Sequence, residues 1–143
     1  MQKKKNKPVS QKFSHLTLER GMCYGTCPVY TVAVTADGKV EWTGEHFVKE
    51  IGHAFWSISK SRMSLINKVL HEACSRYKKG HPECYTDDLA SCNIIVEYPD
   101  KSVKNLEHDF GDHSVPEVMF ALENRLDRLI GTAKYIGKDK DRM

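Results

Sequence analysis

Two cysteines in a short loop are the residues whose types and spacing most directly suggest chemistry. Cys23 and Cys27 are separated by three residues in the segment Cys-Tyr-Gly-Thr-Cys-Pro. Such a pair can staple the loop as a disulfide, act as a redox dithiol or supply half of a metal site. A thioredoxin-like centre has only two intervening residues and lies at a helix N-terminus, whereas proline and a β-rich segment follow Cys27. The pattern favours a structural staple or buried thiols over redox catalysis.

Zinc is an alternative use of the same pair. A structural zinc site needs four nitrogen or sulfur ligands, and a His-x₂-Cys segment lies further along the chain. The candidate zinc ligands are Cys23, Cys27, His81 and Cys84. These four residues can bind one zinc ion only if two loops that are distant in sequence meet. No pattern in the sequence predicts that contact, so we expect no cofactor.

A second group of titratable residues lies between residues 107 and 113, in Glu-His-Asp-Phe-Gly-Asp-His. A carboxylate beside a histidine can orient it as a general base, and a loop before a helix favours anions. Neither a nucleophile nor a phosphate-binding motif accompanies the group, which favours a solvated connection. Together with the polar loop at 80–91, these segments provide the candidate binding residues Tyr24, His81, Asp87, Asp88, His108, Asp112 and His113.

The elements that position these residues begin with strands. Residues 15–19 alternate polar and apolar side chains, and residues 29–35 are rich in β-branched and aromatic types. Asp37-Gly38 is typical of a hairpin turn, so a return strand is expected around 40–42.

Further strands are expected after a less regular stretch that begins at Gly44. Residues 54–58 are apolar and aromatic, which predicts a strand at or near a sheet edge. Residues 92–98 and 102–107 predict a second hairpin, with Pro99-Asp100 in its turn.

Two helices complete the pattern. Apolar residues recur at helical spacing over 61–79, a serine lies near the start, and Gly80 suits the residue after the end. Ser114 and Glu117 are spaced as a capping box for a second helix, which Gly131 is placed to end.

The order β-β-β-β-α-β-β-α predicts an α+β fold, a mainly antiparallel sheet covered on one face by two helices. A chain of 143 residues accommodates one such core. We expect a flexible basic arm at 1–12, a single domain at 13–137 and a charged tail at 138–143.

Composition and charge narrow the class of protein. No apolar run is long enough to span a membrane, and the N-terminal segment is too polar for a secretory signal. We therefore expect a cytoplasmic protein without a membrane partner, whose 5 cysteines are thiols. The net charge is +3, but lysines concentrate in residues 1–12 and the body is mildly acidic.

A resemblance covers roughly residues 13–137. The segment Cys23-Tyr-Gly-Thr-Cys-Pro-Val-Tyr30, the residues His108 and Gly111, and a helix with Glu123 and Asp127 resemble an uncharacterised bacterial family, domain of unknown function 6438. The resemblance implies a fold but no activity. Many relatives look exported, which implies that the two motif cysteines can pair there.

These patterns favour a non-enzymatic protein-binding module, such as an adaptor or an inhibitor of a larger assembly of phage or mobile-element type. The loops at 80–91 and 44–53 are the expected binding elaborations. The alternatives are an enzyme that uses the thiols or zinc at Cys23 and Cys27, and a nucleic-acid-binding protein that uses the basic arm 1–12. Oligomeric state is not predicted by any pattern in the chain.

Overall fold

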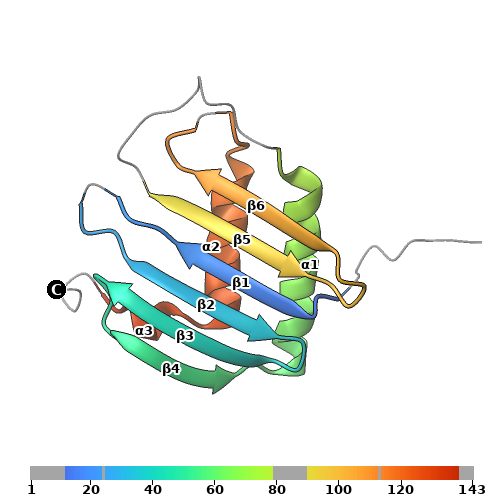
Figure 1. Cartoon of the computed structure of the whole chain (residues 1–143), viewed down its shortest axis with the longest axis horizontal. Helices are drawn as coiled ribbons and strands as arrows, with labels where there is room; N and C mark the ends of the chain where they lie inside the picture. The colour runs from blue at the N-terminus through green and yellow to red at the C-terminus, as the bar shows by residue number, and fades with distance from the viewer. Residues whose placement is uncertain (1–11, 24, 79–89, 113, 139–143) are drawn as a thin grey trace, which may run out of the picture.

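The computed structural model describes residues 12–23, 25–78, 90–112 and 114–138. Within them, six strands form one antiparallel sheet in the order β4-β3-β2-β1-β5-β6 (Figure 1). The strands are β1 (His15–Arg20), β2 (Val29–Thr35), β3 (Lys39–His46), β4 (Gly52–Ser57), β5 (Ser91–Glu97) and β6 (Val103–Asp109). Strands that follow each other in the sequence pair with each other, except that β5 pairs with β1 instead of β4.

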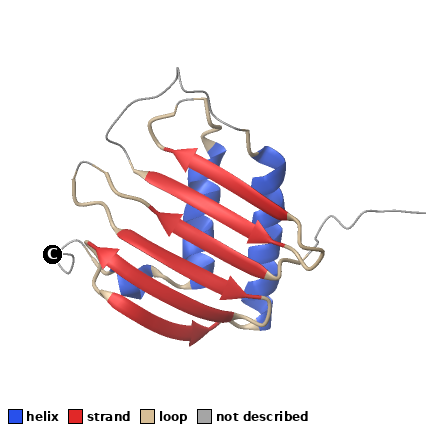
Figure 2. Cartoon of the chain, in the orientation of Figure 1, coloured by secondary structure: helices blue, strands red, loops and turns tan. Residues whose placement is uncertain are grey.

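Two long helices cover one face of the sheet, α1 (Lys60–Arg76) and α2 (Val118–Ile130) (Figure 2). The predicted α+β fold and element order are therefore confirmed. A short helix that the sequence pattern did not predict, α3 (Ala133–Ile136), follows α2.

The core lies between the sheet and the helices. Alternate residues of the central strands point to the helices and are almost fully buried, for example Leu16, Val32 and Ile94. The predicted helical stripes face them, with Ile66 of α1 and Leu126 of α2 both inaccessible to solvent. Burying one such side chain contributes about 1.5–3 kcal/mol, so this shared layer provides the main stabilisation of the fold.

Both predicted hairpin turns are present. Gly38 has φ 85°, a conformation that glycine adopts without strain, and its amide donates to the Thr35 carbonyl. In the second hairpin, the Tyr98 amide donates to the Ser102 carbonyl at 2.9 Å and closes the turn around Pro99 and Asp100.

The predicted helix starts differ from the observed ones. Helix α1 begins one residue earlier than expected because the Ser59 hydroxyl accepts from the Arg62 amide at 3.3 Å, and it ends at Arg76; Gly80 lies outside the described residues. The predicted capping box is wrong, because Ser114 donates its hydroxyl to Asp112 and α2 begins only at Val118. Its end at Gly131, with φ 96°, is as predicted.

The stretch after Gly44 is exposed at most of its residues, as the sequence suggested, but part of it is anchored to the domain. Strand β3 continues to His46, and Val48 is buried against Tyr30 and Trp42 in a second apolar cluster. The backbone amide of Lys49 donates to the Ile136 carbonyl at 2.8 Å, which fastens this stretch to α3. The expected edge position of the following strand, β4, is confirmed.

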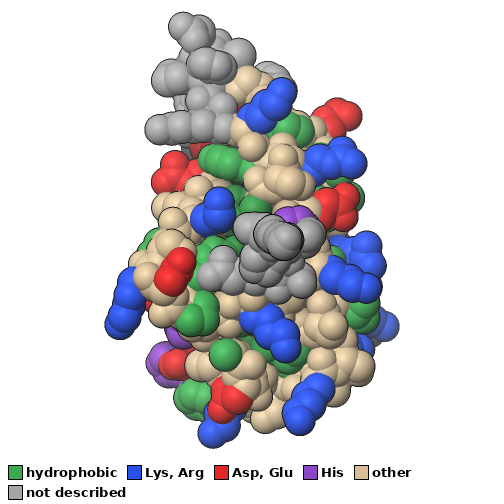
Figure 3. All heavy atoms as spheres, turned by 90° about the vertical axis from the view of Figure 1, so that its right-hand side faces the viewer, with side chains coloured by type: hydrophobic (Ala, Val, Ile, Leu, Met, Phe, Trp, Pro, Cys, Tyr) green, Lys and Arg blue, Asp and Glu red, His purple; other side chains and the backbone are tan. Residues whose placement is uncertain are grey.

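Among the described residues, no helix combines the length and apolar character needed to cross a bilayer. On the face shown in Figure 3, basic and acidic side chains both occur, scattered among neutral and apolar ones.

Candidate functional site

A row of polar side chains crosses the helix-facing side of the sheet at the end where β1 finishes. His108, Cys92, Arg20 and Tyr30 are successive cross-strand partners on β6, β5, β1 and β2. Directly paired residues have their Cβ atoms about 4.5–5.5 Å apart, so the four side chains form one contiguous strip. This strip replaces the apolar residues that occupy the equivalent positions further along the same strands.

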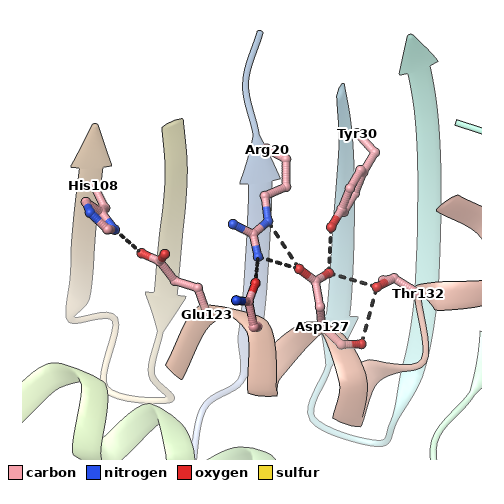
Figure 4. Close-up of polar contacts among 7 residues, drawn as sticks. Arg20, Tyr30, His108, Glu123, Asp127 and Thr132 are labelled. Atoms are coloured by element: carbon pink, nitrogen blue, oxygen red, sulfur yellow. Dashed lines mark hydrogen bonds and ion pairs between the residues drawn. The ribbon is translucent and has the colours of Figure 1, made fainter. Parts of the chain in front are cut away.

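Helix α2 sets two carboxylates against this strip (Figure 4). Glu123 and Asp127 are four residues apart, which places both on the same side of the helix. Glu123 points to His108 at one end of the strip, and Asp127 points to Arg20 and Tyr30 at the other.

Asp127 is the centre of the larger network. Its Oδ2 accepts from Arg20 Nε at 3.1 Å and from Arg20 Nη2 at 2.6 Å. Its Oδ1 accepts from the Tyr30 hydroxyl at 2.7 Å and from the Thr132 hydroxyl at 2.8 Å. The carboxylate thus joins two strands, its own helix and the turn into α3, which is a strong, charge-assisted arrangement.

The second pair is buried more deeply. His108 Nδ1 and Glu123 Oε2 are 2.7 Å apart, and both side chains are inaccessible to solvent. Phe110 and Phe120 pack their rings edge-on against the imidazole, at centroid distances of 4.8 and 4.5 Å. Glu123 Oε1 has no hydrogen-bond partner among the described residues.

Burial governs the ionisation of this strip. Desolvation raises the pKa of Glu123, and the hydrogen bond and charge of His108 only partly offset it. Desolvation and the negative charge of Asp127 raise the pKa of Tyr30, which therefore keeps its proton and donates. Burial likewise raises the pKa of Cys92, so its thiol stays protonated between Arg20 and His108.

A pocket of about 340 Å³ opens beside the network. Arg20, Asn124 and Asp127 form its polar part, and Pro28, Phe110 and Ile136 form its apolar part. We call it the Arg20 pocket. The Asn124 carbonyl oxygen accepts from Arg20 Nη2 at 3.2 Å, which leaves the Asn124 amide as a donor at an exposed position.

The loop between β1 and β2 borders this pocket and contains the predicted cysteine pair. The sulfur atoms of Cys23 and Cys27 are bonded to each other, and Cys27 lines the pocket. The disulfide staples the loop, which is one of the roles considered for this cysteine pair. The expectation of free thiols at these two positions is wrong in this structure. Neither residue is fully buried.

The zinc interpretation has limited support. Sulfur atoms that are bonded to each other do not offer the thiolates that zinc binds, so a site here requires the bond to be reduced first. His81 and Cys84, the other two candidate ligands, lie outside the described residues. Within the described ranges, no cluster of three or more potential ligands occurs.

The other predicted binding residues are distributed as follows. Outside the described residues lie Tyr24, His81, Asp87, Asp88 and His113. Asp112 Oδ1 accepts from the Ser114 amide at 3.0 Å and shapes the turn before α2. The placement of His108 in a solvated connection is wrong, because β6 extends to Asp109 and turns the imidazole inward to Glu123.

The site residues to which the sequence analysis assigned no role are Arg20, Tyr30, Cys92, Asn124 and Thr132, although Tyr30 belongs to the quoted motif. One feature of the sequence pointed to the site. Glu123 and Asp127 each follow a leucine of the buried stripe, so both acidic side chains lie close to the side of the helix that meets the sheet. The resemblance included both residues without assigning them a role.

Comparison with known proteins adds a family but no activity. No curated protein matches this chain significantly. Residues 14–130 match a family described as Domain of unknown function (DUF6438), and the match includes the sheet, the stapled loop and the contact between Arg20 and Asp127. The chain therefore belongs to the DUF6438 family.

Proposed function

We propose that this domain is a protein-binding module that receives an apolar side chain of a partner protein in the Arg20 pocket. The observation that carries this proposal is the combination of apolar walls with a small set of oriented polar groups beside a stapled loop. A volume of about 340 Å³ lies near the lower end of ligand sites, roughly 300–1,000 Å³, and is large enough for one aromatic residue.

The surroundings of the pocket suit a protein better than a small molecule. Phe110 lines the pocket and its ring contacts that of Phe120 at 4.7 Å, and Phe120 is partly exposed. Met22, which follows the pocket residue Gly21, is 65 % exposed. Exposed apolar side chains around a pocket are typical of interfaces in which one anchor residue is surrounded by weaker contacts.

The polar part of the pocket is held in place before any partner arrives. Arg20 is fixed by two hydrogen bonds to Asp127, and Asp127 is fixed in turn by Tyr30 and Thr132. A rigid site loses less conformational entropy on binding. The guanidinium and the Asn124 amide would hold a carbonyl or carboxylate oxygen of the partner, while Pro28 and Ile136 contact its side chain.

The experiment uses a variant that fills the pocket without touching Asp127. Asn124→Tyr introduces a large side chain at an exposed helical position on the pocket wall, and Arg125→Tyr makes the same change on the adjacent exposed residue outside it. Proteins captured from native cells are compared for the wild type and both variants. The partner is then purified, and its affinity for each is measured by calorimetry.

We expect the partner to bind the wild type and Arg125→Tyr within about twofold, and Asn124→Tyr at least about tenfold more weakly. Equal affinity of a purified partner for all three proteins would refute the proposed site. Capture of no specific partner, together with turnover of a small molecule by the purified domain, would refute the proposed function in favour of an enzyme.

A further inference from the structure

The two edges of the sheet differ in how they are protected against pairing with another strand. Strand β6 carries the charged residues Lys104, Glu107 and Asp109, which discourage an incoming strand. Strand β4, at the opposite edge, reads Gly-His-Ala-Phe-Trp-Ser and contains no lysine, arginine, carboxylate or proline. In Figure 1, no described element lies along the outer side of β4.

The position of β4 is fixed from within the domain. Trp56 donates its indole N–H to the Ile130 carbonyl at 2.9 Å and stacks on Tyr135 with ring centroids 4.2 Å apart. Six residues pair in register with β3, from Gly52 to Ser57. An edge strand held in this way presents a row of backbone groups to an incoming strand, and its own backbone loses little freedom on binding.

Apolar side chains project from this same edge. Phe55, in the middle of β4, is 69 % exposed on the face of the sheet that the helices do not cover, and Ile51, just before the strand, is 60 % exposed. An aromatic ring this exposed forgoes hydrophobic stabilisation, which a contact across the edge would recover.

We propose that β4 pairs antiparallel with β4 of a second copy of this chain, around a twofold axis near Phe55. In such a pairing the start of each strand meets the end of the other. Lys49 and Glu50 precede β4 and Lys60 follows it, all exposed, so the carboxylate of one copy approaches an ammonium group of the other.

Pairing with a second copy of β4 fits this edge better than pairing with a strand of another protein, for two reasons. The strand itself contains no lysine, arginine or carboxylate, so these side chains cause no repulsion between two paired copies of the strand. The twofold axis brings Phe55 of one copy next to Phe55 of the other, and aromatic cross-strand pairs are favourable. The product is a continuous twelve-stranded sheet.

A contact of one short strand per copy is small, so the dimer is expected to be weak, with a Kd on the order of 10–100 µM. Sedimentation equilibrium of the full chain, from about 5 to about 500 µM, measures this association directly. The test variant is Phe55→Lys, which places two like charges at the proposed axis. The matched control is Val103→Lys, an equivalent change at a 56 % exposed position on β6.

We expect the wild type and Val103→Lys to dimerise with the same Kd, and Phe55→Lys to remain a monomer throughout the range. Both positions are exposed, so we expect both variants to unfold at midpoints close to that of the wild type. Such midpoints show that the folds are intact. The proposal is overturned by a monomeric wild type at the highest concentration. It is equally overturned by a dimer that Phe55→Lys does not weaken, since another surface then makes the contact.

Discussion

Arg20 Nη2 and Asp127 Oδ2 lie 2.6 Å apart, although the two residues are 107 positions apart in the chain. The contact joins the last residue of β1 to the final turn of α2, and each side chain is only 13 % exposed. It therefore sets where α2 crosses the sheet and, through Tyr30 and Thr132, how the Arg20 pocket is shaped.

The first prediction concerns this contact. Asp127→Asn keeps the shape of the side chain but leaves the Arg20 guanidinium without its counter-ion, and we expect it to lower the free energy of unfolding by about 3 kcal/mol. Tyr30→Phe removes one neutral donor and should cost only about 1 kcal/mol. Urea denaturation measures both. A larger loss in Tyr30→Phe than in Asp127→Asn would show that the carboxylate is not the centre of the network.

The second prediction concerns pH and Glu123. Burial raises the pKa of this carboxyl in the folded state above its unfolded value, so the folded protein binds the proton more tightly. Its contribution to stability is therefore present below the ordinary glutamate pKa and is lost as pH rises through the raised folded value. The charged groups that act on it are His108, Arg20 and Asp127.

Glu123→Gln removes this titration while keeping the side chain's size. We expect the free energy of unfolding of the wild type, minus that of the variant, to fall as pH increases from about 4 toward neutrality. Urea denaturation at constant ionic strength provides the two curves. A difference that stays constant or increases with pH would mean that burial does not control this carboxyl.

The third prediction concerns Gly44 on β3. A Cβ atom at this position would overlap the Glu50 carbonyl oxygen and lie 2.9 Å from Trp42 Nε1. That carbonyl accepts the Trp42 indole N–H, so Gly44→Ala must displace a backbone segment and break this hydrogen bond. We expect a loss of about 3 kcal/mol, compared with about 0.5 kcal/mol or less for Gly25→Ala in the exposed loop. Equal thermal midpoints for the two variants would contradict this.

The fourth prediction concerns the staple between Cys23 and Cys27. The bond closes a loop of only a few residues outside the core, so its entropic contribution is about 2 kcal/mol. The double variant Cys23→Ser, Cys27→Ser should fold and lose about this amount relative to protein purified without reductant. A reducing cytoplasm would hold both cysteines as thiols, so trapping with iodoacetamide in cells measures which form exists there. If the double variant does not fold, the disulfide contributes more to the stability of the domain than this estimate.

Local patterns predicted the elements of this fold well. The alternation in residues 15–19 and the turn chemistry of Asp37-Gly38 act over a few neighbouring residues, so they survive in any tertiary context. The capping box at Ser114 failed because a competing local interaction with Asp112 satisfies the serine before the helix begins. Helix α1 begins one residue before the expected range 61–79 because the Ser59 hydroxyl caps it.

The polar strip could not be predicted in the same way. His108 was noticed beside acidic neighbours in sequence, but its partner is Glu123, 15 residues away on another element. Arg20 and Asp127 each look like ordinary surface charges until the antiparallel register aligns Arg20 with Cys92 and Tyr30. Only the packing of α2 on the sheet then decides which charge meets which.

The amino-acid sequence by itself determined the period of each segment, the turns between them and the helix-facing stripes, because these depend on side-chain spacing and backbone preferences within a few residues. The tertiary structure decided the strand order, the union of Arg20 with Asp127 and the exposure of Phe55 on the unguarded β4 edge. Those features depend on contacts between distant residues, whose energies arise only when burial removes water from around them.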